Sequence, residues 1–100
     1  MLTVYKYRIA LDDYFEIEMP QGAQALTVKF QYGQAQLWAL VNPEVPTQIY
    51  RFRVAGTGHP IKETNLHYIG TFQLMVDTLI IHVFEIPPKP QLMIERGKAN

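Results

Sequence analysis

The stretch LTVKFQY at residues 26–32, followed by Gly33-Gln34, decides the fold class. Its apolar residues occupy every second position, and an extended strand places alternate side chains on opposite faces. An amphipathic helix would need apolar residues three and four positions apart, so this stretch predicts a β-strand with one buried face and one solvated face. Gly33-Gln34 is typical of a two-residue hairpin loop with glycine first, which joins antiparallel strands.

The same alternation recurs along the chain. It predicts strands at residues 3–10, 14–19, 25–32, 35–42, 48–55, 66–76 and 78–86. Two stretches, Leu37–Val41 and Leu79–Phe84, are apolar at successive positions, which is typical of strands covered on both faces by the same domain or by a partner chain. Short connections and the lack of a helical period predict an all-β fold, with about seven antiparallel strands in a compact sandwich or small barrel.

Length and composition bound the organisation of the chain. Its 100 residues, 48% of them hydrophobic, fit a single domain with a proper core. We expect this β domain to span residues 1–86. A proline-rich tail follows at 87–100, and its residues Leu92–Ile94 are apolar enough to pack on the domain or on a neighbour. Gly70, inside the sixth predicted strand, predicts a β-bulge or a close backbone approach.

Charge balance and residue usage exclude several function classes. Nine basic residues offset nine acidic ones, which argues against a protein whose main task is to grip nucleic-acid phosphates, although it leaves room for a local basic pocket. The sequence lacks cysteine, so it forms no disulfide or thiolate metal site. It also lacks serine, so neither a serine nor a cysteine nucleophile is available.

The longest predicted connection holds the best candidate ligand site. It begins AGTGHPIK at residues 55–62, where two glycines let successive backbone amides approach an anion. Two arginines of the preceding strand can each bind a phosphate or carboxylate through paired hydrogen bonds. The expected ligand-binding residues are Arg51, Arg53, Gly56, Thr57, Gly58, His59 and Lys62, with an aromatic contact from Tyr50 or Trp38. The alternative is an ordinary surface loop beside arginines on a solvated sheet face.

Other groups that could carry chemistry have simpler structural explanations. The three histidines, His59, His67 and His82, lack the spacing of a metal site, and the apolar neighbours of His82 predict a buried imidazole with its hydrogen bonds satisfied. Rings and charges alternate in residues 5–8 and 50–53, which places them on opposite faces and weakens a nucleic-acid interpretation. We therefore expect no enzyme activity, no cofactor and no metal; a small hydrolase with His59 as general base is the catalytic alternative.

Six segments form a set that extends over the chain as far as Glu85. They are Tyr7-Arg8-Ile9, the pattern from Phe15 to Ala23, Leu37–Val41, Gly56-Thr57-Gly58-His59, Ile69–Gln73 and His82-x-Phe84-Glu85. Together they resemble a family of small proteins encoded by tailed bacteriophages and prophages, a domain of unknown function. The resemblance supplies no catalytic residues. It implies an accessory protein in the host-cell cytoplasm during infection, where small phage proteins often antagonise host defences.

From these observations we expect a non-catalytic phage accessory binding protein that sequesters a small nucleotide-derived anionic ligand and so antagonises a host defence. We expect a homo-oligomer, because a 100-residue sheet protein has little chain to cover strands that are apolar on both faces. The alternative is a protein–protein inhibitor or virion/assembly component that binds a host or phage protein through a strand edge or apolar patch. We expect no membrane association and no specific nucleic-acid partner, since no stretch has the length of a helical membrane span.

Overall fold

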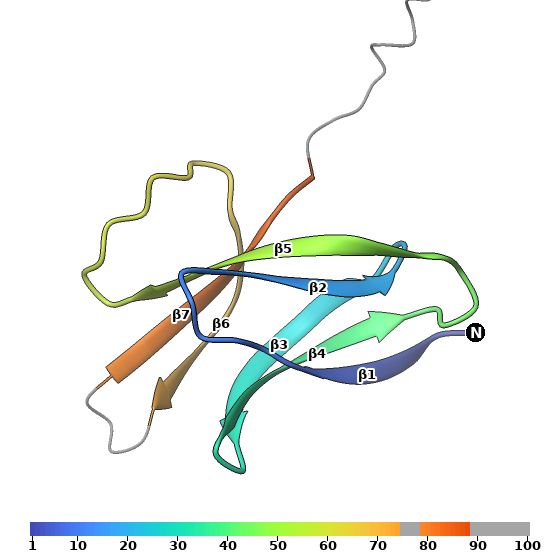
Figure 1. The fold of residues 1–100 in the computed structure, drawn as a ribbon, viewed down its shortest axis with the longest axis horizontal. Coiled ribbons are helices and arrows are strands. Elements are labelled where there is room, and N and C mark those ends of the chain that lie inside the picture. The colour runs from blue at the N-terminus through green and yellow to red at the C-terminus, as the bar shows by residue number, and fades with distance from the viewer. Residues whose placement is uncertain (75–78, 89–100) are drawn as a thin grey trace, which may run out of the picture.

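A computed structural model describes residues 1–74 and 79–88 (Figure 1). These residues form seven antiparallel strands, and none of the described residues forms a helix, so none forms a helical membrane span. The strands are β1 (Thr3–Arg8), β2 (Tyr14–Pro20), β3 (Gln24–Gln31), β4 (Gln34–Val41), β5 (Thr47–Gly56), β6 (His67–Leu74) and β7 (Leu79–Ile86). The predicted all-β class is confirmed, and each strand lies within a few residues of its expected position. The predicted packing of residues 92–94 falls outside the described residues.

The strands form two sheets that differ in their connections. β1, β4 and β3 form the three-stranded sheet in that order, and β2, β5, β7 and β6 form the four-stranded sheet. β3–β4 and β6–β7 are hairpins, whereas β1 pairs with β4 and β2 pairs with β5. The chain therefore changes sheet after β1, after β2 and after β4. This topology makes a two-sheet sandwich in which neighbouring strands are often distant in sequence.

The core lies between the inner faces of the two sheets. Alternate residues of the strands point into it, which is how the period-two pattern of the sequence becomes a buried surface. The rings of Phe15 and Phe52 stack with centroids 4.6 Å apart within the four-stranded sheet. Phe30 of β3 stacks on Phe72 of β6 at 6.3 Å and so joins the two sheets. The largest fully buried side chains are Phe52, Met19, Leu37, Val41 and Val83.

β3 and β6 are in close contact at Gly70. The register of the β6–β7 pair shifts between Tyr68 and Gly70. A Cβ atom on Gly70 would lie only 2.9 Å from Cγ2 of Val28 on β3 and 3.4 Å from the Val28 backbone nitrogen. The expected bulge or close approach at this glycine is confirmed, and both occur there together.

The β3–β4 hairpin turns one residue earlier than the sequence predicts. Gln31 pairs with Gln34, so the two loop residues are Tyr32 and Gly33 rather than Gly33 and Gln34. Both have positive φ angles, 55° and 76°, as the type I′ turn requires. The alternation of residues 26–32 concealed this turn, because Tyr32 occupies the next apolar position of the strand pattern although its ring is exposed.

Candidate functional site

The predicted ligand-binding residues lie in separate parts of the molecule. Trp38 is on β4 of the three-stranded sheet, whereas the other eight residues lie on β5 or in the loop that joins β5 to β6. Figure 1 shows this loop, in yellow, projecting beyond the end of β5. Along β5, successive side chains point to opposite faces of the sheet, so even neighbouring predicted residues diverge.

Arg53 is not the solvated side chain that the alternation predicts. It is only 8% exposed, because the loop after β5 folds over it. Its guanidinium lies 3.2 Å from the Glu63 carboxylate and donates to the carbonyl oxygens of Val54 and Pro60 at 2.6 Å and 3.0 Å. Its Cζ atom also lies 5.0 Å from the centroid of the Tyr14 ring. The positive charge of Arg53 is therefore neutralised inside the protein and is not available to an external anion.

Glu63 closes this contact between the loop and the sheet. The Tyr14 hydroxyl donates to the Glu63 carboxylate at 2.5 Å. This hydrogen bond, with a smaller contribution from Arg53, holds the pKa of Glu63 below its usual range. The same bond raises the pKa of the Tyr14 hydroxyl. Sequence reasoning missed Glu63; the available signal was a lone carboxylate in a loop that follows two strand arginines.

An exposed chain of hydroxyl and imidazole groups lies beside the start of the loop. The Thr57 hydroxyl is 2.7 Å from Nε2 of His82, and the Thr71 hydroxyl is 3.0 Å from its Nδ1. The Tyr68 hydroxyl lies 2.7 Å from that of Thr71. His82 is half-buried rather than buried, but both of its ring nitrogens have a partner, as expected. These contacts join the beginning of the loop to β6 and β7.

The glycine-rich turn uses one of its own amides internally. The His59 amide donates to the Gly56 carbonyl at 3.1 Å, and Gly58 has a φ of 89°, a conformation that favours glycine. The His59 ring packs over Gly56, 3.0 Å from where a Cβ atom would lie. Thr57 turns instead toward His82. The turn thus separates the hydroxyl and the imidazole that were expected to converge on one ligand, while Lys62 is exposed farther along the loop.

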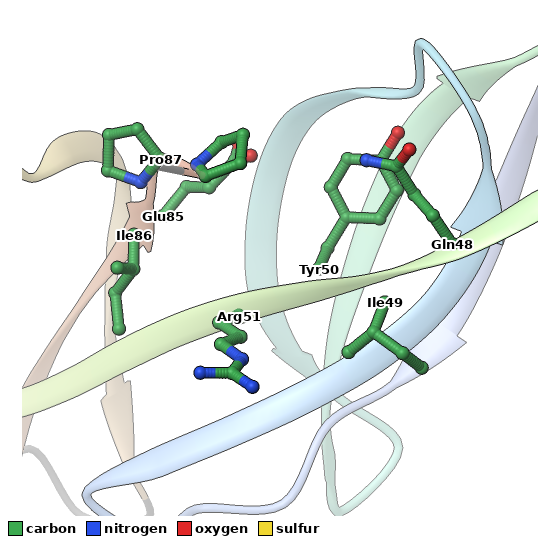
Figure 2. A pocket seen from close by; sticks show the side chains of 8 residues that line it. Gln48, Ile49, Tyr50, Arg51, Glu85, Ile86 and Pro87 are labelled. Carbon is green, nitrogen blue, oxygen red and sulfur yellow. The ribbon is translucent and has the colours of Figure 1, made fainter. Parts of the chain in front are cut away.

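A hollow of about 420 Å³ lies where β7 ends beside β5 (Figure 2). It is lined by residues 48–51 of β5 and by residues 85–88. Figure 2 shows Tyr50 and Arg51 on opposite sides of β5. Arg51 pairs with Glu16 at 3.3 Å, and burial raises the pKa of Glu85 at the other wall. An anion in this hollow would meet the Glu85 carboxylate and an arginine that is already paired with Glu16, so the hollow does not suit the expected ligand.

Tyr50 has a structural role at the end of the same hollow. Its buried hydroxyl donates to the Pro20 carbonyl at 2.9 Å and accepts from the Ala23 amide at 3.0 Å. Ala23 also donates to the Pro20 carbonyl, across a turn in which Gly22 has a φ of 79°. The hydroxyl thus fastens the turn between β2 and β3 to β5, and it has no capacity left for a ligand.

The charged residues of the three-stranded sheet are all cations and lie on its outer face. They are Lys6, Arg8 and Lys29. Lys6 pairs with Trp38 across β1 and β4, and Arg8 and Lys29 both pair with Gln36. Residues that pair directly in antiparallel strands point to the same face, so the three cations lie on the same face as Trp38, Lys6 directly beside it and the other two in the next row. None of the three strands, which are described in full, carries a carboxylate.

The same face has a hollow of about 410 Å³ beside Trp38. Two exposed apolar residues border it, Val4 and Leu26, which are 49% and 42% exposed. The Lys6 ammonium lies 6.0 Å from the centroid of the half-buried Trp38 ring. We call this surface the Trp38 face; it consists of Val4, Lys6, Arg8, Leu26, Thr27, Lys29, Gln31, Gln36 and Trp38.

Sequence reasoning named Trp38 but missed the cations around it. Within one strand, rings and charges do fall on opposite faces: Tyr5 and Tyr7 pair with inward residues of β4, while Lys6 points outward. The pairing of β1 with β4 then places an aromatic ring of one strand among the charges of another. The one signal in the sequence was that residues 3–8 and 24–31 carry charges of a single sign.

Residues 1–92 match the family described as a domain of unknown function, DUF7352. No curated protein and no solved structure matches the chain. The match includes all seven strands and both sheets, and it bears out the expected domain of unknown function without indicating a phage origin. The chain is therefore a member of the DUF7352 family.

Proposed function

We propose that this chain is a non-catalytic binding protein that captures a small nucleotide-derived anionic ligand on the Trp38 face. One observation carries the proposal: every charged residue of the three-stranded sheet is a cation on the face that holds Trp38. A nucleotide combines a flat aromatic base with a phosphate. An indole ring stacks on the base, and lysine and arginine bind the phosphate. This face therefore offers a partner for each part of a nucleotide.

This proposal moves the site away from the loop after β5. Arg53 is neutralised by Glu63, the exposed Arg51 lies beside the Glu16 carboxylate, and Tyr50 is engaged with the turn between β2 and β3. On the Trp38 face no carboxylate of the three strands competes with the ligand. The side chains of this face are cations, amides, one hydroxyl and apolar groups, which suit binding rather than acid–base catalysis.

The proposal extends to the biological setting through the sequence resemblance. In a bacterial cell infected by a phage, sequestering a nucleotide-derived signal would antagonise a host defence. The support for this setting is the resemblance to phage-encoded proteins, together with a binding face suited to nucleotides.

A homo-oligomer is part of the same proposal. β1 is an edge strand, and its Val4 and Tyr5 side chains are 49% and 43% exposed. An exposed strand edge pairs readily with another strand. Pairing of two β1 strands would extend the three-stranded sheet and place two Trp38 faces side by side.

The exposed β1 edge also favours a second candidate function. A protein–protein inhibitor or assembly component would add a strand of a host or phage protein to this edge by β-augmentation. Capture of a single stoichiometric protein that protects the β1 amides from hydrogen exchange, with no response to nucleotides, would favour this candidate.

The test uses the single tryptophan of the chain as its probe. Mononucleotides, cyclic nucleotides and ADP-ribose are titrated at low salt while Trp38 fluorescence and the melting temperature are recorded. At least one class should quench the fluorescence and raise the melting temperature. The double variant Lys6→Gln/Lys29→Gln should weaken binding at least tenfold.

A matched variant distinguishes the two possible sites. Arg51→Gln/Lys62→Gln also removes two cations, but from β5 and its loop. Loss of binding in this variant alone would return the site to the loop. No response to any ligand of the panel would refute the proposed function.

A further inference from the structure

We infer that the ligand of the Trp38 face is a single-stranded nucleic acid that contacts it over more than one nucleotide. The inference rests on the proposed function, whose binding face it keeps, and extends the ligand from one small nucleotide to a chain of nucleotides. It starts from the layout of the cations, which are spread over the sheet rather than gathered around one point. Cations spread in this way favour a ligand with several phosphates over a ligand with one.

Two adjacent rows of outward residues across β1, β4 and β3 hold the cations. One row is Lys6, Trp38 and Thr27, and the next is Arg8, Gln36 and Lys29. Neighbouring strands lie about 4.8 Å apart, and outward residues of one strand are about 6.6 Å apart. Arg8 and Lys29 are therefore rooted about 10 Å from each other, with Gln36 between them. Cations rooted this far apart have to bend toward one another to reach a single phosphate, so their spacing favours a ligand that offers each cation a phosphate of its own.

The uncharged groups of the face suit base recognition. The hollow beside Trp38 is lined by Val4 and Leu26, which offer apolar walls to a flat ring, and by the amide side chain of Gln31. Amide and hydroxyl side chains such as those of Gln31 and Thr27 form hydrogen bonds with base edges. Stacking on Trp38 requires an unpaired base, so the face favours a single strand over a duplex.

The neutral total charge of the protein does not oppose this inference. The expectation of no nucleic-acid partner came from the balance of nine basic and nine acidic residues, and from rings and charges on opposite faces of each strand. A local field is set by the charges that line a surface rather than by their sum over the chain. On the Trp38 face, these charges have one sign and lie on the same side as the ring.

The test compares ligands that differ only in length. Thymidine monophosphate and oligothymidylates of two, four and eight nucleotides are titrated against the full chain, with Trp38 fluorescence as the readout. Affinity should rise at least tenfold from the mononucleotide to the tetranucleotide. Three phosphate contacts predict a slope of about −2 in a plot of log affinity against log salt, since each contact on a single strand contributes about −0.7. Lys29→Gln should reduce the slope by about 0.7, whereas Lys62→Gln, far from this face, should leave it near −2.

Each contrary result has a distinct meaning. Equal affinity for the mononucleotide and the octamer would overturn this inference and leave the proposed function intact, whereas no binding of any nucleotide would remove both. A duplex that binds as tightly as the single strand would overturn the single-strand assignment. Polyglutamate binding at similar affinity, unaffected by Trp38→Leu when both proteins are measured by titration calorimetry because this variant lacks the fluorophore, would show that the face binds an acidic protein. Should Trp38→Leu fail to fold, the salt slopes of the wild type and of Lys29→Gln still decide the outcome.

Discussion

Replacing Gly70 by alanine should destabilise the sandwich where β6 packs against β3 of the other sheet. The added Cβ would lie 2.9 Å from Cγ2 of Val28, whereas carbon atoms in favourable contact are about 3.5–4.0 Å apart. Overpacking of this kind costs about 1–3 kcal/mol, and the lower entropy of the unfolded alanine chain offsets about 0.4–1 kcal/mol. We expect a net loss of about 1–2 kcal/mol, which for a domain of this length lowers Tm by roughly 5–15 °C.

Urea unfolding monitored by Trp38 fluorescence measures this loss, and two companion variants identify its cause. Gly56→Ala also adds a methyl group to a buried strand glycine, but its obstacle is the exposed His59 ring, which can rotate away, so stability should change little. Val28→Ala alone should cost about 2 kcal/mol through lost burial and a cavity. In the double variant with Gly70→Ala the new methyl group occupies the vacated space. The double variant should therefore lose less stability than the sum of the losses in the two single variants. Full additivity, or a Gly70→Ala protein as stable as wild type, would refute the reasoning.

Three further predictions concern buried or partnered polar groups. Tyr50→Phe removes the hydroxyl that bonds Pro20 and Ala23, and should cost about 1–2 kcal/mol in urea unfolding without weakening nucleotide binding. The pKa of Glu63 is lowered in the folded state, so its stabilising effect is present above the ordinary glutamate pKa of about 4.3 and is lost as the pH falls through the lowered value. Glu63→Gln should therefore unfold at lower urea than wild type at pH 7, and the gap should shrink below a pH of about 4; a constant gap would contradict this. Burial raises the pKa of Glu85 because the ionised carboxylate is poorly solvated in the fold. The folded protein therefore loses stability as the pH rises through the raised value and Glu85 ionises. Glu85→Gln should raise the urea midpoint at pH 7 and lose this advantage below a pH of about 4, and an equal advantage at both pH values would count against the assignment.

Strand positions were predictable because their signal is local. Period-two alternation identifies the buried face of a strand whatever its partner is, and the apolar runs of β4 and β7 identify strands covered on both faces. Gly70 was also predictable, because a glycine inside a strand pattern has few explanations other than a bulge or a close neighbour. The β3–β4 turn was misplaced by one residue, since Tyr32 continues the strand pattern and enters the turn with a positive φ.

Contacts between distant segments were beyond the same reasoning. The alternation of β5 places Arg53 on the exposed face of the strand. It is buried only because the loop after β5 folds back and brings Glu63 against it. Likewise, nothing within residues 3–8 reveals that β1 pairs with β4 rather than with β2. That pairing determines which charged residues share a face with Trp38. The residues of the candidate site therefore follow from the strand topology rather than from any sequence motif.

The grouping of Lys6, Arg8 and Lys29 on one face gives this neutral molecule an uneven distribution of charge, with one positive face. A neutral body has no net charge for a polyanion to attract, but an uneven distribution of its charges makes it rotate in the field of the polyanion. Such a torque turns the tryptophan side forward before contact, and raising the ionic strength weakens it. Encounters of this protein with a polyanion would then be orientated before they are close, in spite of a total charge of zero.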